Sequence, residues 1–336
     1  MDIYLKRAVL HMCDRNANSM IYSDELMDLT QDFSAEYAKR KVEKISNAKT
    51  KLGKLAKEGK LGVLASDINR ENFLEKSREF AEMWAHFYLQ SEDGPSCDLL
   101  FTLYEKDAQE HFAFLKLNHK EGMTHFVEQD DSTINNKLMI HRAILPAASS
   151  AADEAFSVKL TDLSFELLEK RYEFSGEKKY YLSEYLIEIE TNLQPSMDES
   201  AREVRKLVKS IGKKYEDDEY EVMADVKEAL YSSFEEFGAI NNDFIAEKVF
   251  ADNYSAQAEY KEEIAQILPL EPIELTDIRE ISEKKFGKQK LKMDNGIELI
   301  VPLEVYQDAN SVEFINNPDG TISIVIKNIE KITNRF

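Results

Sequence analysis

Cysteine is scarce in this sequence, since its 336 residues include only Cys13 and Cys97. Two cysteines in so long a chain exclude a disulfide framework and are typical of a reduced intracellular protein. No stretch reaches the ~18 uninterrupted apolar residues of a membrane-spanning helix. The first residues, MDIYLKRAVLHMCDRN, also lack the apolar run of a signal peptide. These absences together predict a soluble cytoplasmic protein with no membrane partner.

Catalytic signatures are absent as well. The chain contains no G-x-S-x-G or C-x-x-C motif. The segment GKLAKEGKLG (53–62) has the glycines and lysines of a phosphate-binding loop but not the G-x-x-x-x-G-K-[ST] order that places them around a nucleotide. We therefore expect no enzymatic activity, no catalytic residue, no metal and no cofactor.

Positive charge is the minority, with 43 basic against 64 acidic residues and a net charge of −21. Such a balance argues against a protein that coats DNA by charge alone, because phosphate contacts need a local excess of Lys and Arg. It leaves room for a local basic patch, since salt limits electrostatic fields to roughly 8–10 Å. The 43% hydrophobic content is ample for packed cores in two or three domains.

One segment reverses the charge balance. Residues 39–60, KRKVEKISNAKTKLGKLAKEGK, carry nine positive and two negative side chains, so the segment is +7 and the rest of the chain is −28. Two further basic groups lie at 202–214 and 284–292. Each is either a solvated surface or a set of point charges that bind phosphates without reading bases. The acidic run EDDEYE (216–221) is typical of a helix N-terminus, or of a surface for a basic partner.

The periodicity of the sequence predicts an α+β fold. Residues 4–13 and 20–29 suit a hairpin, and apolar residues recur at helical spacing from about Thr30 to Ala48 and again over 67–90. Glycines predict a loop in the second half of the basic segment. An antiparallel β-meander is expected over the runs 98–107, 110–122, 123–131 and 137–147, continuing through 156–169 and into 178–190.

Four helices are expected next, over 201–215, 216–238, 242–252 and 255–268, ending near Pro269. Two hairpins close the chain, one around Asn295-Gly296 and one around Pro318-Asp319-Gly320. Because the strand with Ile322, Ile324 and Ile326 is apolar on both faces, we expect it to be covered. The predicted parts are a mixed N-terminal domain (1–190), a helical middle segment (191–268) and a C-terminal β-hairpin element (269–336).

Two metal-like patterns have simpler explanations. Asp14, Asn16, Asn18 and Glu25 fall at positions 1, 3, 5 and 12 of a calcium-binding loop, but position 6 is Ser19 where the turn needs glycine. A hairpin turn accounts for the same residues, although the sequence leaves calcium binding open. The second pattern combines histidines with nearby carboxylates but fits no metal-ligand spacing. Its residues are His111, His119, His125, Glu110, Asp130 and Asp131.

Three segments resemble one bacterial protein family. They are AVLH (8–11), SNAKTKLGKL (46–55) and the C-terminal run PIELTDIREISEKKFGKQKLKMDNGIELIVPLEVYQDANSVEFINNPDGTISIVIKN (272–328). Together with the order of hairpin, helix, meander, helices and hairpins, they resemble the roughly 37-kilodalton nucleoid-associated protein family. The resemblance implies a nucleoid location, association with DNA and a topoisomerase as a further partner, with no established enzymatic activity.

The resemblance favours DNA as the partner of the basic segments. The predicted nucleic-acid contacts are Arg40, Lys44, Lys49, Lys51, Lys54, Lys57, Arg205, Lys209 and Lys213. A rival hypothesis is an adaptor that reaches the nucleoid through protein contacts, which the −28 outside the first segment favours. A metal-dependent nuclease requires the histidines to meet carboxylates in space. Oligomeric state, the choice between DNA and RNA, and the convergence of the basic groups stay open.

Overall fold

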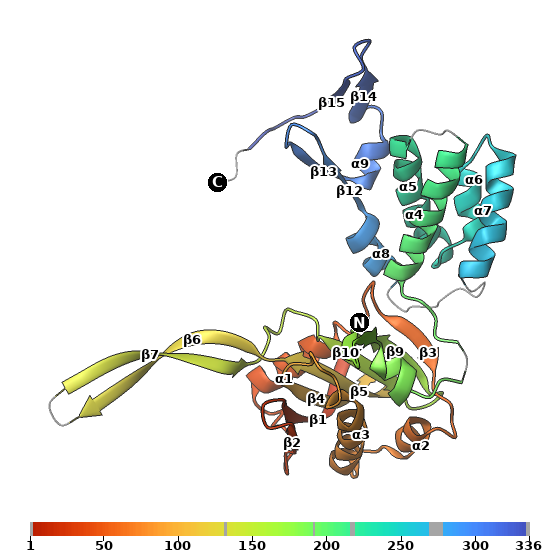
Figure 1. Ribbon diagram of the computed structural model, residues 1–336. Helices are drawn as coiled ribbons and strands as arrows, with labels where there is room; N and C mark the ends of the chain where they lie inside the picture. The colour runs from red at the N-terminus through yellow and green to blue at the C-terminus, as the bar shows by residue number, and fades with distance from the viewer. Residues whose placement is uncertain (1–2, 131–132, 191, 216–218, 269–277, 334–336) are drawn as a thin grey trace. The chain divides into compact units, whose positions relative to one another are not determined.

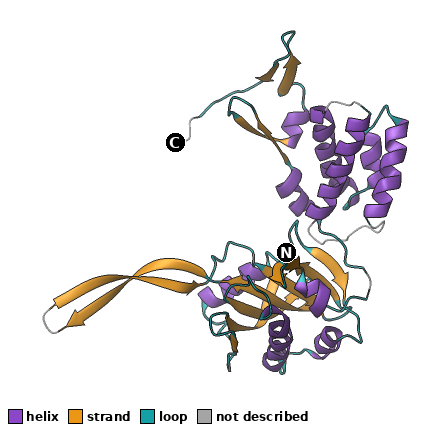
Figure 2. Ribbon diagram, in the orientation of Figure 1, coloured by secondary structure: helices purple, strands orange, loops and turns teal. Residues whose placement is uncertain are grey.

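The computed structural model describes residues 3–130, 133–190, 192–215, 219–268 and 278–333. The chain divides into two compact units, Met1–Met197 and Asp198–Phe336. Antiparallel sheets and helices occur in both, so the predicted α+β class is confirmed (Figures 1 and 2). The three-part division at 190 and 268 stays a prediction, and Pro269 lies outside the described residues.

Unit 1 is built on a seven-stranded antiparallel sheet of order β2-β1-β4-β5-β8-β9-β3. Its strands are β1 (Ile3–Asp14), β2 (Ser19–Ile21), β3 (Lys51–Lys54), β4 (Cys97–Lys106), β5 (Gln109–Asn118), β8 (Glu154–Lys159) and β9 (Ser164–Leu168). The expected N-terminal hairpin is present as β1 and β2, joined through Asn18 at φ 49°. The predicted meander is interrupted, because β5 pairs with β8 and the chain between them forms a separate ribbon.

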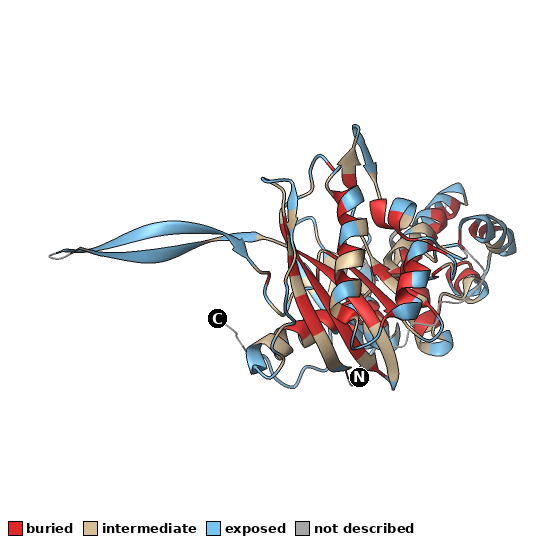
Figure 3. Cartoon of the chain, turned by 90° about the horizontal axis from the view of Figure 1, so that it is seen from below, coloured by how far each residue is buried: buried red, intermediate tan, exposed pale blue. Residues whose placement is uncertain are grey.

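Helices cover both faces of this sheet. On one face, α1 (Asp32–Val42) buries Ala38 and Val42 against β4, β5 and β8. On the other, α2 (Lys60–Asp67), α3 (Phe73–Tyr88) and the short π-helix η1 (Leu182–Leu186) pack on an aromatic core. Phe80 lies at its centre, with ring centroids 5.1–5.9 Å from those of four phenylalanines: Phe101, Phe112, Phe114 and Phe156. Figure 3 shows this buried layer.

Four predictions for this unit were wrong in detail. The first helix ends at Val42 rather than Ala48, so the basic segment continues through a turn into β3. The second half of the basic segment, expected as loop, contains the strand β3, and its last residue, Lys60, begins α2. A Cβ at Gly62 would come within 2.1 Å of the Ala56 carbonyl oxygen, so only glycine allows the close approach at the start of this helix. The second helix begins at Phe73 rather than near Asp67. Residues 178–190 contribute η1 instead of a long strand.

Two two-stranded sheets of unit 1 lie outside its main sheet. The pair β10 (Tyr172–Phe174) and β11 (Glu177–Lys179) forms a small hairpin. A ribbon of β6 (Lys120–Asp130) and β7 (Thr133–Ile144) pairs only with itself and extends away from the sheet (Figure 1).

Unit 2 contains the four expected helices, which are confirmed as α4 (Met197–Lys214), α5 (Glu219–Phe237), α6 (Asn242–Val249) and α7 (Tyr254–Ile267). A further helix, α8 (Ile278–Phe286), stacks Phe286 on Phe234 of α5 at 5.7 Å. Both C-terminal hairpins are also confirmed, as β12 (Lys288–Lys292) with β13 (Glu298–Pro302) and β14 (Val312–Asn316) with β15 (Ile322–Ile326). The short helix α9 (Leu303–Gln307) joins them. Gly296 and Gly320 adopt φ of +88° and +82° in the two turns.

The expected burial of the last strand was wrong. Ile322 is 58% exposed and Ile326 is 48% exposed, because β14 and β15 form an isolated two-stranded sheet. An alternating apolar sequence identifies the strand but not the element that covers it. Among the described residues, no helix is long and apolar enough to cross a membrane.

The histidine of the AVLH segment explains part of the pH dependence that we expect of unit 1. His11 is 1% exposed. Ser77 donates its hydroxyl proton to the Leu74 carbonyl, so its oxygen accepts from His11 Nε2 at 3.1 Å. The Ser23 backbone N–H donates to His11 Nδ1 at 3.1 Å. The imidazole is therefore neutral with its proton on Nε2, and a second proton on Nδ1 would oppose the Ser23 N–H.

Burial, and then the charge of Arg78, lower the pKa of His11 to about 4. An unfolded histidine binds a proton near its ordinary pKa of 6.5, so folding stability is complete above pH 6.5 and falls as the pH drops toward 4. The loss from this one group reaches roughly 3 kcal/mol. We expect His11→Gln to be less stable at pH 7 but less sensitive to acid between pH 6.5 and 4.5. Urea unfolding followed by fluorescence at three pH values measures both, and equal acid sensitivity of the two proteins would contradict the assignment.

Candidate nucleic-acid interface

The basic segment 39–60 is partly neutralised by nearby carboxylates. Three of its six predicted DNA contacts form ion pairs: Arg40 with Glu36 at 2.5 Å, Lys51 with Glu169 at 3.1 Å and Lys54 with Glu190 at 2.8 Å. The Lys51 side chain is only 13% exposed, and its ammonium lies 4.1 Å from the centre of the Tyr180 ring. Burial raises the pKa of Glu169, and the positive charge of Lys51 opposes that rise. Lys51 therefore has a structural partner inside unit 1.

The other three predicted DNA contacts of this segment lack such partners among the described residues. Lys49 and Lys57 are exposed and Lys44 is half-buried, and none of them forms an ion pair within the described parts of the chain. A fourth lysine, Lys41, is fully buried and donates to the carbonyl oxygens of Ala147 and Ser150, both at 2.9 Å. Burial lowers its pKa to about 8. Some lysines of the segment thus hold unit 1 together, while others remain accessible to a ligand.

The basic group of unit 2 forms a stripe along one face of α4. Successive positions three or four residues apart share a helix face, and the spacing of these side chains follows that rule. The stripe consists of Arg202, Lys206, Lys209 and Lys213, all exposed. The opposite face is buried: Val204, Val208 and Ile211 are at most 2% exposed. Residues 202–214 hold six positive side chains and one negative, a local charge of +5.

The second and third basic groups approach each other at Lys227 in unit 2. Arg205 of α4 and Lys290 of β12 lie close enough to Lys227 of α5 to act on its charge. Burial is the larger cause of the lowered pKa of Lys227, and the two positive neighbours add to it. The Lys227 ammonium donates to the carbonyl oxygen of Lys288. Three elements of unit 2 therefore bring like charges together, which costs free energy unless an anion lies nearby.

Sequence reasoning missed Lys227 because no other basic residue adjoins it along α5, where acidic side chains such as Asp225 and Glu228 surround it. Arg205 was predicted because it lies in the basic group 202–214. The contact between the second and third basic groups depends on how α4, α5 and β12 pack, and no local pattern encodes that packing. Lys209 and Lys213 remain predicted contacts.

The candidate metal residues are separated in space. His119 lies 3.2 Å from Asp98, whereas His111 stacks on Tyr104 in the sheet and His125 is exposed on the β6–β7 ribbon. Among the described residues, no group of three His, Cys, Asp or Glu side chains is placed to hold a metal ion. Asp131 lies outside the described residues. In the calcium-like segment, the Asp14 carboxylate accepts the backbone N–H of Asn16 at 2.9 Å, as in an Asx turn of a hairpin.

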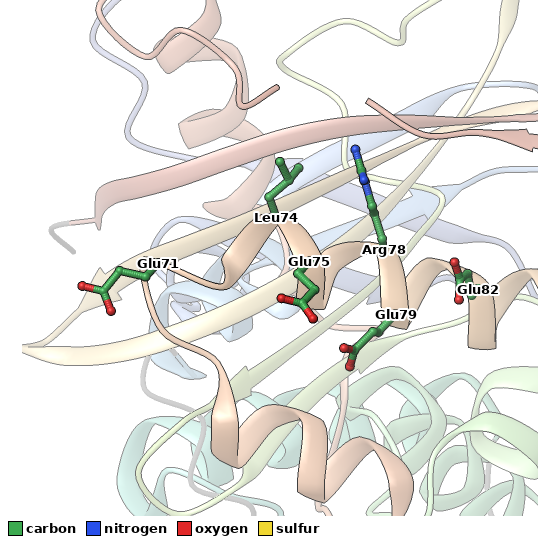
Figure 4. A pocket seen from close by; sticks show the side chains of 6 residues that line it. All are labelled: Glu71, Leu74, Glu75, Arg78, Glu79 and Glu82. Carbon is green, nitrogen blue, oxygen red and sulfur yellow. The ribbon is translucent and has the colours of Figure 1, made fainter. Parts of the chain in front are cut away.

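A shallow pocket on α3 is acidic rather than basic. Figure 4 shows Glu75, Glu79 and Glu82 along the helix, with Arg78 pointing away from Glu75 and Glu79. The pocket is lined by Glu71, Leu74, Glu75, Arg78, Glu79 and Glu82. Arg78 donates to Asp24 at 2.6 Å, so its charge is also engaged. Phosphate groups would be repelled from this face of unit 1.

The chain matches the model of one protein family, which is described as nucleoid-associated protein YejK (NA37), over residues 9–333. The match spans both units and includes α4, β12 and the β6–β7 ribbon. This match confirms the family resemblance inferred from the sequence. A search of curated proteins gave no match.

Proposed function

Because the chain belongs to the nucleoid-associated protein YejK family, we propose that it is a non-enzymatic nucleoid protein that contacts DNA through clusters of lysine and arginine. The family membership supports a location at the nucleoid. The contacts would be made with phosphates, since lysine ammonium groups act as point charges and carry no base code. Sequence-independent binding with strong salt dependence follows from that chemistry.

The stripe on α4 is the observation that carries this proposal. Its four side chains lie within 12 residues, from Arg202 to Lys213, about 16 Å along the helix axis. Over that length of the duplex axis, one DNA strand places roughly five phosphates, one for each ~3.4 Å of axis. The group around Lys227 extends the positive surface toward β12. The segment 39–60 adds Lys44, Lys49 and Lys57 as further contacts on unit 1.

The alternative is an adaptor that reaches the nucleoid through a protein such as a topoisomerase and touches DNA weakly or not at all. The acidic face of α3 favours it, because a basic protein surface would complement those carboxylates. The ion pairs of Arg40, Lys51 and Lys54 favour it too, since they reduce the charge available to DNA. The α4 stripe has no role in this alternative.

Fluorescence anisotropy with a short labelled duplex at low salt separates the two proposals. We expect saturable binding by the full-length protein, and loss of most of it when Arg202, Lys206, Lys209 and Lys213 are replaced by glutamine. A matched control replaces four exposed lysines elsewhere by glutamine, so that net charge changes equally: Lys120, Lys178, Lys248 and Lys331. Equal weakening by both variants would show that duplex binding depends on net charge alone and not on the stripe. No binding by the unaltered protein would favour the adaptor.

A further inference from the structure

The β6–β7 ribbon of unit 1 is an exposed two-stranded sheet with no covering element in the described structure. Every described residue of β7 is exposed, and Figure 3 shows both strands exposed along their length. Their register is antiparallel, with Met123 opposite Ile140 and Gln129 opposite Ile134. Isolated two-stranded hairpins are at best marginally stable in water. A long ribbon of this kind therefore requires a partner surface to be fixed in place.

One face of the ribbon is largely apolar. Residues directly opposite in an antiparallel pair share a face, and alternate residues along each strand do too. The face so defined carries Met123 (71% exposed), Val127 (49%), Ile134 (68%), Leu138 (75%) and Ile140 (51%). Its other members, His125, Gln129 and Asn136, are polar but carry no carboxylate, lysine or arginine. Leu138, the most exposed of the five, lies near the middle.

Four charged side chains of the ribbon are paired with one another. Lys137 forms an ion pair with Glu128, and Arg142 forms one at 3.2 Å with Glu121. Over 120–144 the sequence has three Lys or Arg against four Asp or Glu, a net charge of −1. Phosphate backbones bind surfaces with an excess of positive charge, which this ribbon lacks. Its composition therefore fits an apolar protein surface rather than nucleic acid.

We propose that the apolar faces of two β6–β7 ribbons pack against each other and join two copies of this chain into a dimer. The five side chains expose on the order of 500 Å², as much as the largest apolar patch of a typical soluble monomer, and such patches often mark interaction sites. Two such faces together bury on the order of 1,000 Å², the minimum expected of a biological interface. A two-fold axis at Leu138, perpendicular to the strands, brings the two Leu138 side chains together and places Met123 of one copy beside Val127 of the other.

The ribbon offers a matched pair of variants. Leu138 belongs to the apolar face, while the next residue, Met139, is 47% exposed on the opposite face. We expect the full-length protein to sediment as a dimer at micromolar concentration and Leu138→Glu to raise its dissociation constant at least 100-fold. Met139→Glu should leave the dimer intact. Circular dichroism checks that both variants fold.

A crosslinking experiment tests the geometry. The two-fold arrangement places L138C beside its symmetry equivalent, so mild oxidation should yield a covalent dimer much faster than for M139C. Native Cys13 and Cys97 are buried and should not react. A monomeric unaltered protein, or equal effects of the two glutamate variants, would overturn the proposal. A monomer that loses duplex binding only in Leu138→Glu would also overturn it and assign the ribbon to DNA.

Discussion

Lys116→Met is expected to destabilise unit 1 by about 3–5 kcal/mol, because it leaves the Glu154 carboxylate buried without its cation. Both side chains are fully buried, and the Lys116 ammonium lies 3.4 Å from a Glu154 oxygen. The same ammonium donates to the Tyr172 hydroxyl at 2.6 Å and to Asn118 at 2.8 Å. Burial raises the pKa of Glu154, and the positive charge of Lys116 opposes that rise.

Fluorescence-monitored urea unfolding measures this effect on unit 1 alone. The chain has a single tryptophan, Trp84, whose indole N–H donates to the Tyr181 hydroxyl at 2.7 Å next to Glu154. The double variant Lys116→Met with Glu154→Leu should recover most of the lost stability, since no buried charge remains. A single variant within 1 kcal/mol of the unaltered protein would show that the pair is hydrated or protonated instead.

Phe80→Ala should cost about 3–5 kcal/mol, as for other large aromatic side chains removed from a packed core. Phe80 is 1% exposed, and its ring lies among those of Phe101, Phe112, Phe114 and Phe156. These rings come from α3, β4, β5 and β8, so the cavity would weaken the contact between helix and sheet. The control is Phe33→Ala, because Phe33 is 74% exposed on α1.

We expect Phe33→Ala to change the free energy of unfolding by less than about 0.5 kcal/mol. Urea unfolding at pH 7 compares both variants with the unaltered protein under the same conditions. A similar small loss for both would mean that the aromatic layer under α3 rearranges to fill the space left by Phe80.

Local sequence patterns predicted the helices and strands better than they predicted what those elements pack against. The four helices of unit 2 and both C-terminal hairpins followed from helical spacing and from glycines at turns, which act over a few residues. The α2 helix did not, because Gly62 is required by the nearby Ala56 carbonyl and not by a turn. Likewise, alternation identified β15 but could not supply the element that covers it.

The candidate interface was likewise predictable only where the signal is local. The basic stripe on α4 can be predicted from the sequence, since its spacing alone defines one helix face. The partners of Lys51 and Lys54 cannot be predicted in this way, because Glu169 and Glu190 are more than 100 residues from the lysines they pair with. The grouping of Arg205, Lys227 and Lys290 likewise depends on three separate elements. The apolar face of the β6–β7 ribbon required the register of the two strands.

The salt dependence of duplex binding tests the central claim, direct phosphate contact through the α4 stripe, most directly. Four phosphate contacts predict a slope of log K against log[salt] of about −3.6, or roughly a 100-fold loss of affinity between 50 and 200 mM salt. Additional contacts around Lys227 would make the slope steeper. Neutralising the four stripe residues should flatten it by about 3.6, while the four-lysine control should leave it unchanged. A slope near zero for the unaltered protein, or the same slope in the stripe variant, would contradict the account.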